Sequence, residues 1–342
     1  MIFSRKRIRW VWPVAAVAVL ILVTAAARFF MPHKTAFESS TETVRFGLAL
    51  QIPSAVAIMA AELGYFKREG LEASIRTYPS GKRSLRDGLF SGEVDMVTAG
   101  DVPVVFASFE RNDFRIVAAI GASDDEQRVI ARRASGVRVP ADLKGKKIGV
   151  QEASASHYFL DLFLMKNGLR EEDVQVSFGR VEDFADVLAS GGVDAFVSRE
   201  PYVSQARKKL GKEAVLFQMP GLYRRLELVA VSSRFLKEKP EAVRRAVRAF
   251  FRARRYIDEH PNESIRAVAD RLQGSYAETS SEWQGISWQV GLGQSLFDRM
   301  DGIARWAAGR GLVPKDRAPN YLEFVDAKIL KDMDPESVTI VE

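Results

Sequence analysis

Two serines and a histidine stand directly after a short apolar run near the middle of the chain. The run 148–150 predicts a buried strand, and Ser154, Ser156 and His157 occupy the loop and first helical turn that follow it. The first N–H groups of a helix have no partner within the helix, so hydroxyl groups beside them can help to hold a small anion or a polar head group. A serine can also cap a helix without any ligand, and a single histidine can simply be packed, so these alternatives stay open.

Six further residues stand where other predicted strands end and helices or turns begin. In open α/β sheets, ligands bind beyond the carboxyl ends of the strands, so we expect these positions to face a shared ligand. The six are Gln51, Ser80, Gly100, Asp101, Arg199 and Glu200. A carboxylate of Asp101 or Glu200 that faced the ligand would favour one with an amino group. The structural alternatives are helix capping for Asp101, an exposed ion pair for Arg199 with Glu200, and a solvated basic turn around Ser80.

Residues able to do covalent or metal chemistry are scarce. The chain has no cysteine, and its three histidines (His33, His157 and His260) are far apart in the sequence, so a histidine-rich metal site is not expected. The sequence patterns of hydrolase serine turns, phosphate-binding loops and dinucleotide-binding loops are also absent. We therefore expect a receptor for a small solute, not an enzyme, with no cofactor and no metal.

Composition agrees with a globular receptor. Of the 342 residues, 47% are hydrophobic and 27% are charged, and the formal net charge is a moderate +6. The basic residues are spread along helices such as 244–255 and are not concentrated with aromatic residues on one face. We therefore expect no nucleic-acid partner.

The first 31 residues differ in character from the rest. Arg5, Lys6, Arg7 and Arg9 precede an uncharged apolar run over 10–27. This pattern predicts either a signal peptide, cleaved after Ala27, or a membrane anchor, and in both cases the remainder of the chain is exported. Residues 32–43 are polar and predict a linker. Without cysteine, the exported part can form no disulfide and carry no lipid.

Stretches typical of strands alternate with stretches typical of helices, which indicates parallel α/β sheets. A first set of predicted strands covers 44–50, 72–78, 94–98, 115–120 and 128–131, and a second set covers 147–150, 174–178, 193–197 and 214–217. One more strand, 226–232, precedes a tail that we expect to be helical. The segments 91–97 and 190–196 share Ser-Gly-x-Val-Asp, which is either an internal repeat or a common way to end a helix and begin a strand.

Seven segments together have the pattern of a known family. They are 57–66, 70–72, 91–95, 143–150, 154–160, 192–196 and 200–201. In these segments the chain resembles the periplasmic solute-binding proteins of ABC transporters for aliphatic sulfonates, taurine, nitrate and thiamine-precursor pyrimidines. The resemblance covers roughly residues 44–235.

The resemblance implies a two-lobed α/β fold, the second type of periplasmic binding protein, in which each lobe has a mainly parallel sheet flanked by helices. The first lobe would combine 44–130 with 225–342, and the second would hold 135–220. A ligand would lie between the lobes, and the closed complex would dock on a membrane permease driven by an ATPase. The protein would be located in the periplasm or at the outer face of the inner membrane.

Two functions remain open at this point. The first is capture of a small organosulfur or nitrogenous ligand for import. Mixed polarity of the candidate residues favours a sulfonate- or taurine-like molecule over nitrate, and nitrate and a thiamine-precursor pyrimidine are the alternatives. The second is a membrane-anchored sensory receptor of the same fold, in which the N-terminal segment is retained.

Overall fold

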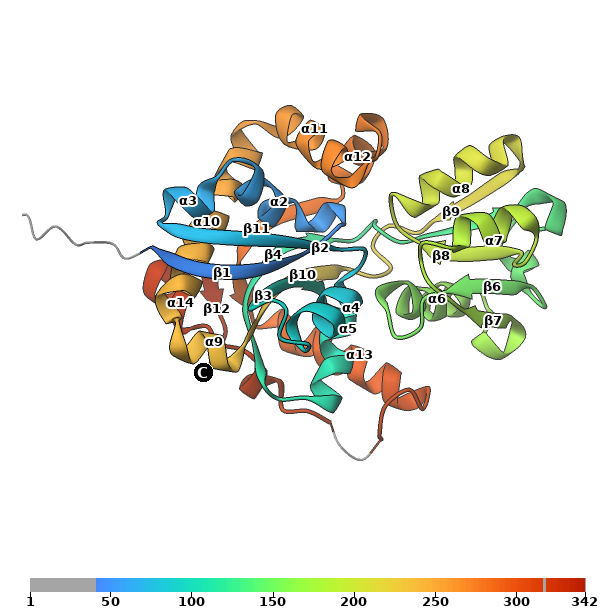
Figure 1. Ribbon diagram of the computed structural model, residues 1–342. Helices are drawn as coiled ribbons and strands as arrows, with labels where there is room; N and C mark the ends of the chain where they lie inside the picture. Colours follow the sequence, from blue (N-terminus) through green and yellow to red (C-terminus); the bar gives the residue numbers. More distant parts are fainter. Residues whose placement is uncertain (1–40, 316–317, 342) are drawn as a thin grey trace, which may run out of the picture. The chain divides into compact units, whose positions relative to one another are not determined.

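The computed structural model describes residues 41–315 and 318–341, which form two β-sheets with helices packed on them (Figure 1). The strands are β1 (Glu42–Ala49), β2 (Leu71–Tyr78), β3 (Met96–Gly100), β4 (Phe114–Ser123), β5 (Arg128–Arg132), β6 (Lys147–Val150), β7 (Gln175–Phe178), β8 (Ala195–Ser198), β9 (Ala214–Gln218), β10 (Arg225–Ser232), β11 (Ile286–Gly293) and β12 (Val338–Thr339). The α-helices are α2 (Ala55–Glu62), α3 (Tyr65–Arg68), α4 (Gly81–Arg83), α5 (Asp101–Glu110), α6 (Ala155–Lys166), α7 (Phe184–Ser190), α8 (Tyr202–Leu210), α9 (Ser233–Glu238), α10 (Pro240–Glu259), α11 (Pro261–Leu272), α12 (Tyr276–Trp283), α13 (Ser295–Gly309) and α14 (Lys328–Met333).

The strands divide into a larger and a smaller sheet. The larger sheet has the order β12-β11-β4-β10-β3-β1-β2, and the smaller has the order β7-β6-β8-β5-β9. We refer to the larger sheet with its helices as lobe 1 and to the smaller, green to yellow in Figure 1, as lobe 2. The expected α/β fold with two sheets is confirmed. Strand β5, part of which we had assigned to the first lobe, pairs with β8 and β9 in lobe 2.

Both sheets are mixed in strand direction. β1 runs parallel to β2 and β3, and β6 runs parallel to β7 and β8, as expected. β10 is antiparallel to β3 and β4, and β5 is antiparallel to β8 and β9. Each of these two strands, β5 and β10, is the first strand after the chain passes from one sheet to the other. No local sequence pattern signals this reversal of strand direction.

The tail after β10 contains two strands that we had not predicted, β11 and the two-residue β12 that pairs with it. β11 is antiparallel to β4, with a register shift between Trp288 and Gly291. We expected only helices in this region because α10 to α13 dominate its apolar spacing. Pairing with β4 determines the conformation here, since β-propensity depends strongly on the neighbouring strand.

The core of lobe 1 lies between its sheet and the long helix α10. Nine of the ten residues of β4 are buried, and α10 buries its apolar side against α2 and α3. Phe46, Phe66 and Phe250 pack together there, with ring centroids 5.7–5.9 Å apart. Aromatic rings at this spacing add to the stabilisation that burial provides.

The two Ser-Gly-x-Val-Asp segments have the same structural role in the two lobes. The carboxylate of Asp95 accepts a hydrogen bond from the N–H of Arg45 (2.9 Å), and the carboxylate of Asp194 accepts one from the N–H of Lys147 (3.0 Å). The N–H of each aspartate in turn donates to the carbonyl of that same partner residue, at 2.7 and 2.8 Å. In each lobe the aspartate thus begins the pairing of two parallel strands.

The expected signal peptide or anchor (1–31) and most of the expected linker lie outside the described residues, although Glu42 and Thr43 belong to β1. Within 41–315 and 318–341, no helix is both long enough and apolar enough to cross a membrane.

Candidate ligand-binding site

Two short connections join the lobes, and they are bonded to each other. Residues 124–127 lead from β4 to β5, and residues 219–224 lead from β9 back to β10. The N–H of Gly221 donates to the carbonyl of Asp124 (2.9 Å). At the end of the second connection, Arg225 forms an ion pair with Glu126 of the first (3.0 Å). These contacts hold the two connections together where the chain crosses between the lobes.

A cavity of about 40 Å³ lies beside this crossing, and both lobes contribute to its wall. From lobe 1 come residues that follow β1, β2 and β3, and from lobe 2 come residues that follow β6 and β8. The lining residues are Gln51, Ser80, Gly81, Lys82, Gly100, Pro103, Gln127, Gln151, Ser154, Ala155, Ser156, Val181, Arg199 and Arg225.

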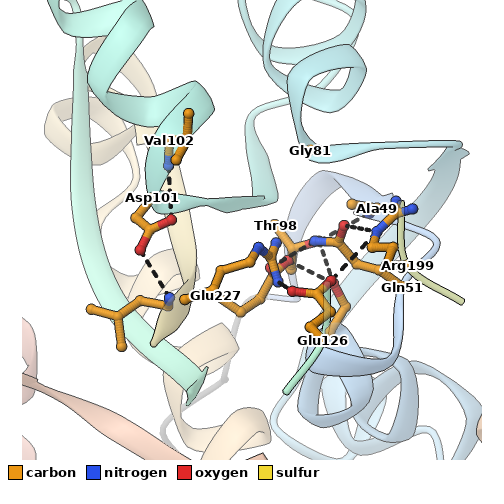
Figure 2. A network of polar contacts seen from close by, with 12 residues as sticks. Ala49, Gln51, Gly81, Thr98, Asp101, Val102, Glu126, Arg199 and Glu227 are labelled. Atoms are coloured by element: carbon orange, nitrogen blue, oxygen red, sulfur yellow. Dashed lines mark hydrogen bonds and ion pairs between the residues drawn. The ribbon is translucent and has the colours of Figure 1, made fainter. Parts of the chain in front are cut away.

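A network of buried polar contacts forms one wall of the cavity (Figure 2). The side chain of Gln51, in lobe 1, donates to Glu227 (2.6 Å) and accepts from Nε of Arg199, in lobe 2 (3.2 Å). Arg225 donates to Glu227, and Ser54 Oγ donates to the other oxygen of Glu227 (2.7 Å). Arg199 also lies 3.5 Å from Glu126 and donates to the carbonyl of Pro79 (3.0 Å). The network thus holds Gln51 and Arg199 in place across the two lobes.

The charges of the arginines and glutamates in the network balance one another. The residues that line the cavity, taken alone, have an excess of positive charge. Arg199 and Arg225 are balanced by Glu126 and Glu227, which lie behind the cavity wall. The lining residues include the cations Lys82, Arg199 and Arg225 but no acidic residue. Such a wall favours a ligand with a single anionic group.

Burial changes the ionisation of these groups in opposite directions. It raises the pKa of Glu227, and the guanidinium of Arg225 opposes this rise. Burial alone would lower the pKa of Arg225, but Glu126 and Glu227 raise it above its ordinary value, so Arg225 stays charged. Burial lowers the pKa of Lys82, an effect that Glu152 partly offsets. An anionic group placed in the cavity would stabilise the charged form of Lys82.

The N-termini of α5 and α6 both open onto the cavity. Gly100 precedes α5, and Ser154 caps α6 by accepting a hydrogen bond from the N–H of His157 (3.3 Å). Ser156 donates to the side-chain oxygen of Gln127 in the first connection (2.7 Å). A side chain at position 100 would collide with Arg225, whose guanidinium would lie 2.6 Å from an added Cβ. Glycine therefore allows the arginine to reach the cavity.

Six of the nine residues proposed from the sequence line this cavity: Gln51, Ser80, Gly100, Ser154, Ser156 and Arg199. They lie together because each follows the carboxyl end of a strand whose neighbour has the same direction.

The other three residues do not line the cavity and have structural contacts instead. Asp101 is fully buried and accepts hydrogen bonds from Tyr223 and from the N–H groups of Val102 and Leu226. In Figure 2, Asp101 lies at a distance from Gln51, Glu126 and Arg199. His157 packs its ring against Phe178 and Trp306, both at 5.2 Å between centroids. Glu200 accepts from the N–H of Ser204 (3.0 Å), and burial raises its pKa.

These contacts remove the reason for expecting an amino group on the ligand, since neither Asp101 nor Glu200 faces the cavity. Several other residues line the cavity although they were not predicted from the sequence. Arg225 begins β10, so it does not follow a strand end, and Gln127 directly precedes β5. Lys82 was noted only as part of a solvated turn. Only the pairing of β10 with β3 and β4, which is not readable from the sequence, brings Arg225 to the cavity.

Comparisons with known proteins place the chain in a family. A family model described as "NMT1/THI5 like" matches residues 51–264, which include every residue of the cavity wall. An Escherichia coli K12 protein assigned as an aliphatic sulfonates-binding protein is 30% identical over 173 residues, which cover 50% of this chain and 53% of that protein. This chain therefore spans about half the length of that relative.

Two solved structures show how widely the fold is used. The alkanesulfonate-binding protein SsuA of Xanthomonas axonopodis pv. citri, bound to MOPS, has a TM-score of 0.71 and 22% identity, covering 84% of this chain and 99% of that one. The desulfurization enzyme DSZB has a TM-score of 0.61 and 16% identity, covering 86% and 99%. The family and fold expected from the sequence are thus confirmed. At these identities the structures show the fold alone, so function is argued from the site.

Proposed function

We propose that this chain, which belongs to the NMT1/THI5-like family, is an exported solute-binding protein that captures a small organosulfonate anion between its lobes. The observation that carries the proposal is the cavity wall, which combines three cations, several hydroxyl and amide groups and two helix N-termini with no acidic residue. Hydrogen-bond donors around such a cavity suit an oxyanion head group with several acceptor oxygens.

The positions of the connections support capture by closure. Both connections lie on one side of the cavity, so the lobes can part and close about them as about a hinge. A ligand that contacts Ser156 of lobe 2 and Lys82 of lobe 1 at once would stabilise the closed arrangement. We propose that this closed form is delivered to an ABC permease and its ATPase at the outer face of the inner membrane.

The ligand class is tested by calorimetry and thermal unfolding with methanesulfonate, taurine, nitrate, sulfate and a thiamine-precursor pyrimidine. A sulfonate at one hundred times its Kd should stabilise the protein by about 2.7 kcal/mol. We expect methanesulfonate to bind at least as tightly as taurine, because no carboxylate faces the cavity to receive the amino group. Binding of nitrate or the pyrimidine, with none of any sulfonate, would refute this ligand class.

Lys82→Met tests the site directly. The variant keeps the aliphatic stem and removes the cation, so sulfonate affinity should fall by about tenfold to a hundredfold, the range for a lost hydrogen bond to a charged group. Lys166→Met, at the exposed end of α6, is the matched control and should bind normally. Equal affinity of the two variants would place the anion elsewhere. Recovery of the bound sulfonate chemically unchanged after long incubation is the result expected of a binding protein.

A further inference from the structure

We propose that lobe 1 has a second binding site, for a small organic dianion such as a dicarboxylate or a phosphate monoester. The site is a cavity of about 370 Å³ beside β4, β11, β12 and the first turn of α13. It shares no lining residue with the cavity between the lobes. This inference therefore goes beyond the proposed function and does not depend on it.

The size of the second cavity and the strand beside it both suit a ligand site. Sites for small organic ligands commonly have volumes of about 300–1,000 Å³, and this cavity lies within that range. In the pairing of β11 with β4, Gln289 and Val290 stand opposite the single residue Ile120. Such a bulge interrupts the ladder of hydrogen bonds, and bulges are common beside functional sites. Both residues of the bulge line the cavity.

The lining residues carry two positive charges and no negative charge. Arg224 and Arg299 line the cavity, and neither forms an ion pair with any other residue that the structure describes. The charge of Arg299 acts on the buried Asp101, but the carboxylate of Asp101 is bonded to Tyr223 and to the backbone. Two guanidinium groups without an acidic partner favour a ligand that has two negative charges.

Arg299 is held in place and still has a donor to offer. Its Nη1 donates a hydrogen bond to the carbonyl oxygen of Arg224. Its Nε is buried and contacts no hydrogen-bond acceptor among the described residues. A buried donor without a partner is unfavourable, so an oxyanion in the cavity that supplied the acceptor would be stabilised. A guanidinium can bind a carboxylate or a phosphate through two parallel hydrogen bonds.

The rest of the wall indicates an organic ligand and not a bare inorganic anion. Ser295 lies in the first turn of α13, a 15-residue helix whose N-cap residue, Gln294, forms no side-chain cap. The free N–H groups of such a turn add to the attraction for an anion. Opposite these polar groups, five apolar side chains would contact the carbon atoms of the ligand: Ala122, Leu226, Val290, Leu292 and Leu296.

The test is calorimetry with succinate, glycerol 3-phosphate and butyrate, with excess methanesulfonate present to occupy the cavity between the lobes. Succinate and butyrate both have four carbons and differ in having two charges or one. We expect one succinate or one glycerol 3-phosphate to bind per chain, at least about tenfold more tightly than butyrate, because butyrate can pair with only one of the two arginines.

Three variants locate the dianion. Arg299→Gln should lower its affinity by about tenfold to a hundredfold, the range for a lost hydrogen bond between charged groups. Arg224→Gln changes an exposed side chain, so it should fold normally, and it should also weaken the dianion. Arg305→Gln is the matched control, because Arg305 is an exposed arginine of the same helix that lies outside the cavity lining. It should bind the dianion as the wild type does.

The possible results separate this inference from the proposed function. No binding of either dianion, or the same affinity in Arg224→Gln and Arg305→Gln, would overturn the second site. Equal affinity for butyrate and succinate would overturn the dianion class. Lys82→Met should bind the dianion normally, and a loss there would place the dianion between the lobes. If a dianion binds as expected and no sulfonate binds, the proposed function fails and the second site stands.

Discussion

Glu282 shows what burial does to a carboxyl group that forms no ion pair with any of the described residues. It lies on α12 and is only 2% exposed, and one of its oxygens contacts no hydrogen-bond donor among the described residues. Burial raises its pKa well above the ordinary 4.5, and the negative charges of Glu126 and Glu200 raise it further. Glu227, equally buried, differs in having Arg225, Gln51 and Ser54 as partners.

We predict that Glu282→Gln has a higher free energy of unfolding than the wild type, and that this difference grows as the pH rises. The folded-state pKa of Glu282 lies above its unfolded value, so between the two values the folded state binds more protons and stability falls with increasing pH. That loss begins near pH 4.5 and continues up to the raised pKa. Glutamine cannot ionise, so the variant should match the wild type below about pH 4.5 and exceed it above. Urea unfolding at pH 4, 6 and 8 measures the difference, and a constant difference at all three would contradict the prediction.

Single residues also show which positions beside the cavity can be predicted from the sequence. Gln51, Ser154 and Ser156 were predictable because each follows a strand whose position and direction are legible in the local pattern. Asp101 and Glu200 have the same kind of position, but their side chains turn to the backbone of Leu226 and Ser204. Side-chain direction after a strand depends on three-dimensional neighbours, which a single sequence does not reveal.

At the level of helices and strands, two glycines differ in their surroundings: one is closely packed in a strand, and the other lies on an open part of a helix surface. Gly149 lies in β6, and a Cβ added there would come within 2.6 Å of the Phe184 ring. Gly302 lies in α13, where an added Cβ would meet nothing within 4 Å. The same substitution should therefore have opposite effects at these two positions.

We predict that Gly149→Ala destabilises the protein by about 1–3 kcal/mol, because Phe184 must move from its stacked contact with Phe196. Gly302→Ala should stabilise it by up to about 1 kcal/mol, the difference in helix propensity between the two residues. Equilibrium unfolding in urea measures both changes, and each variant serves as the control for the other. Two changes of the same sign would contradict the packing argument.

The elements themselves were largely predictable where the pattern is local. The strands up to 232 lie within a few residues of their expected positions. Strand β11 was missed because its identity depends on β4, more than 160 residues earlier in the sequence. The two Ser-Gly-x-Val-Asp segments were noticed, but their shared function, the aspartate that begins each parallel pairing, is visible only in the structure.

At the level of the whole described chain, the lobes also meet away from the cavity, between α6 and α13. Asp161 of lobe 2 accepts hydrogen bonds from the indole N–H of Trp306 (3.0 Å) and from Arg310 (3.2 Å) of lobe 1. The ring of Trp306 also contacts those of His157 and Tyr158 on α6. Because Ser154 caps the same helix and Ser156 lies in its first turn, this contact and the ligand would stabilise the same arrangement of the lobes.

We predict that Asp161→Asn weakens sulfonate binding about fivefold, without touching the cavity. The change removes the nearer of two charged partners of Arg310, which also lies 3.7 Å from Glu171, and partial exposure limits the loss to about 1 kcal/mol. Small-angle scattering of the ligand-free variant should show a larger radius of gyration. Asp332→Asn, which breaks an ion pair within lobe 1, is the matched control. Unchanged affinity and radius would contradict a role for this contact in closure.

The path of the chain through the sheets has a consequence for biogenesis. Lobe 2 is one uninterrupted segment, whereas the sheet of lobe 1 needs β10 and β11, which are synthesised only after lobe 2 is complete. A nascent chain that had reached residue 220 could assemble the whole smaller sheet, while β3 and β4 still awaited the strand that lies between them. During that interval their unpaired edges would be the part of the newborn polypeptide most in need of a chaperone.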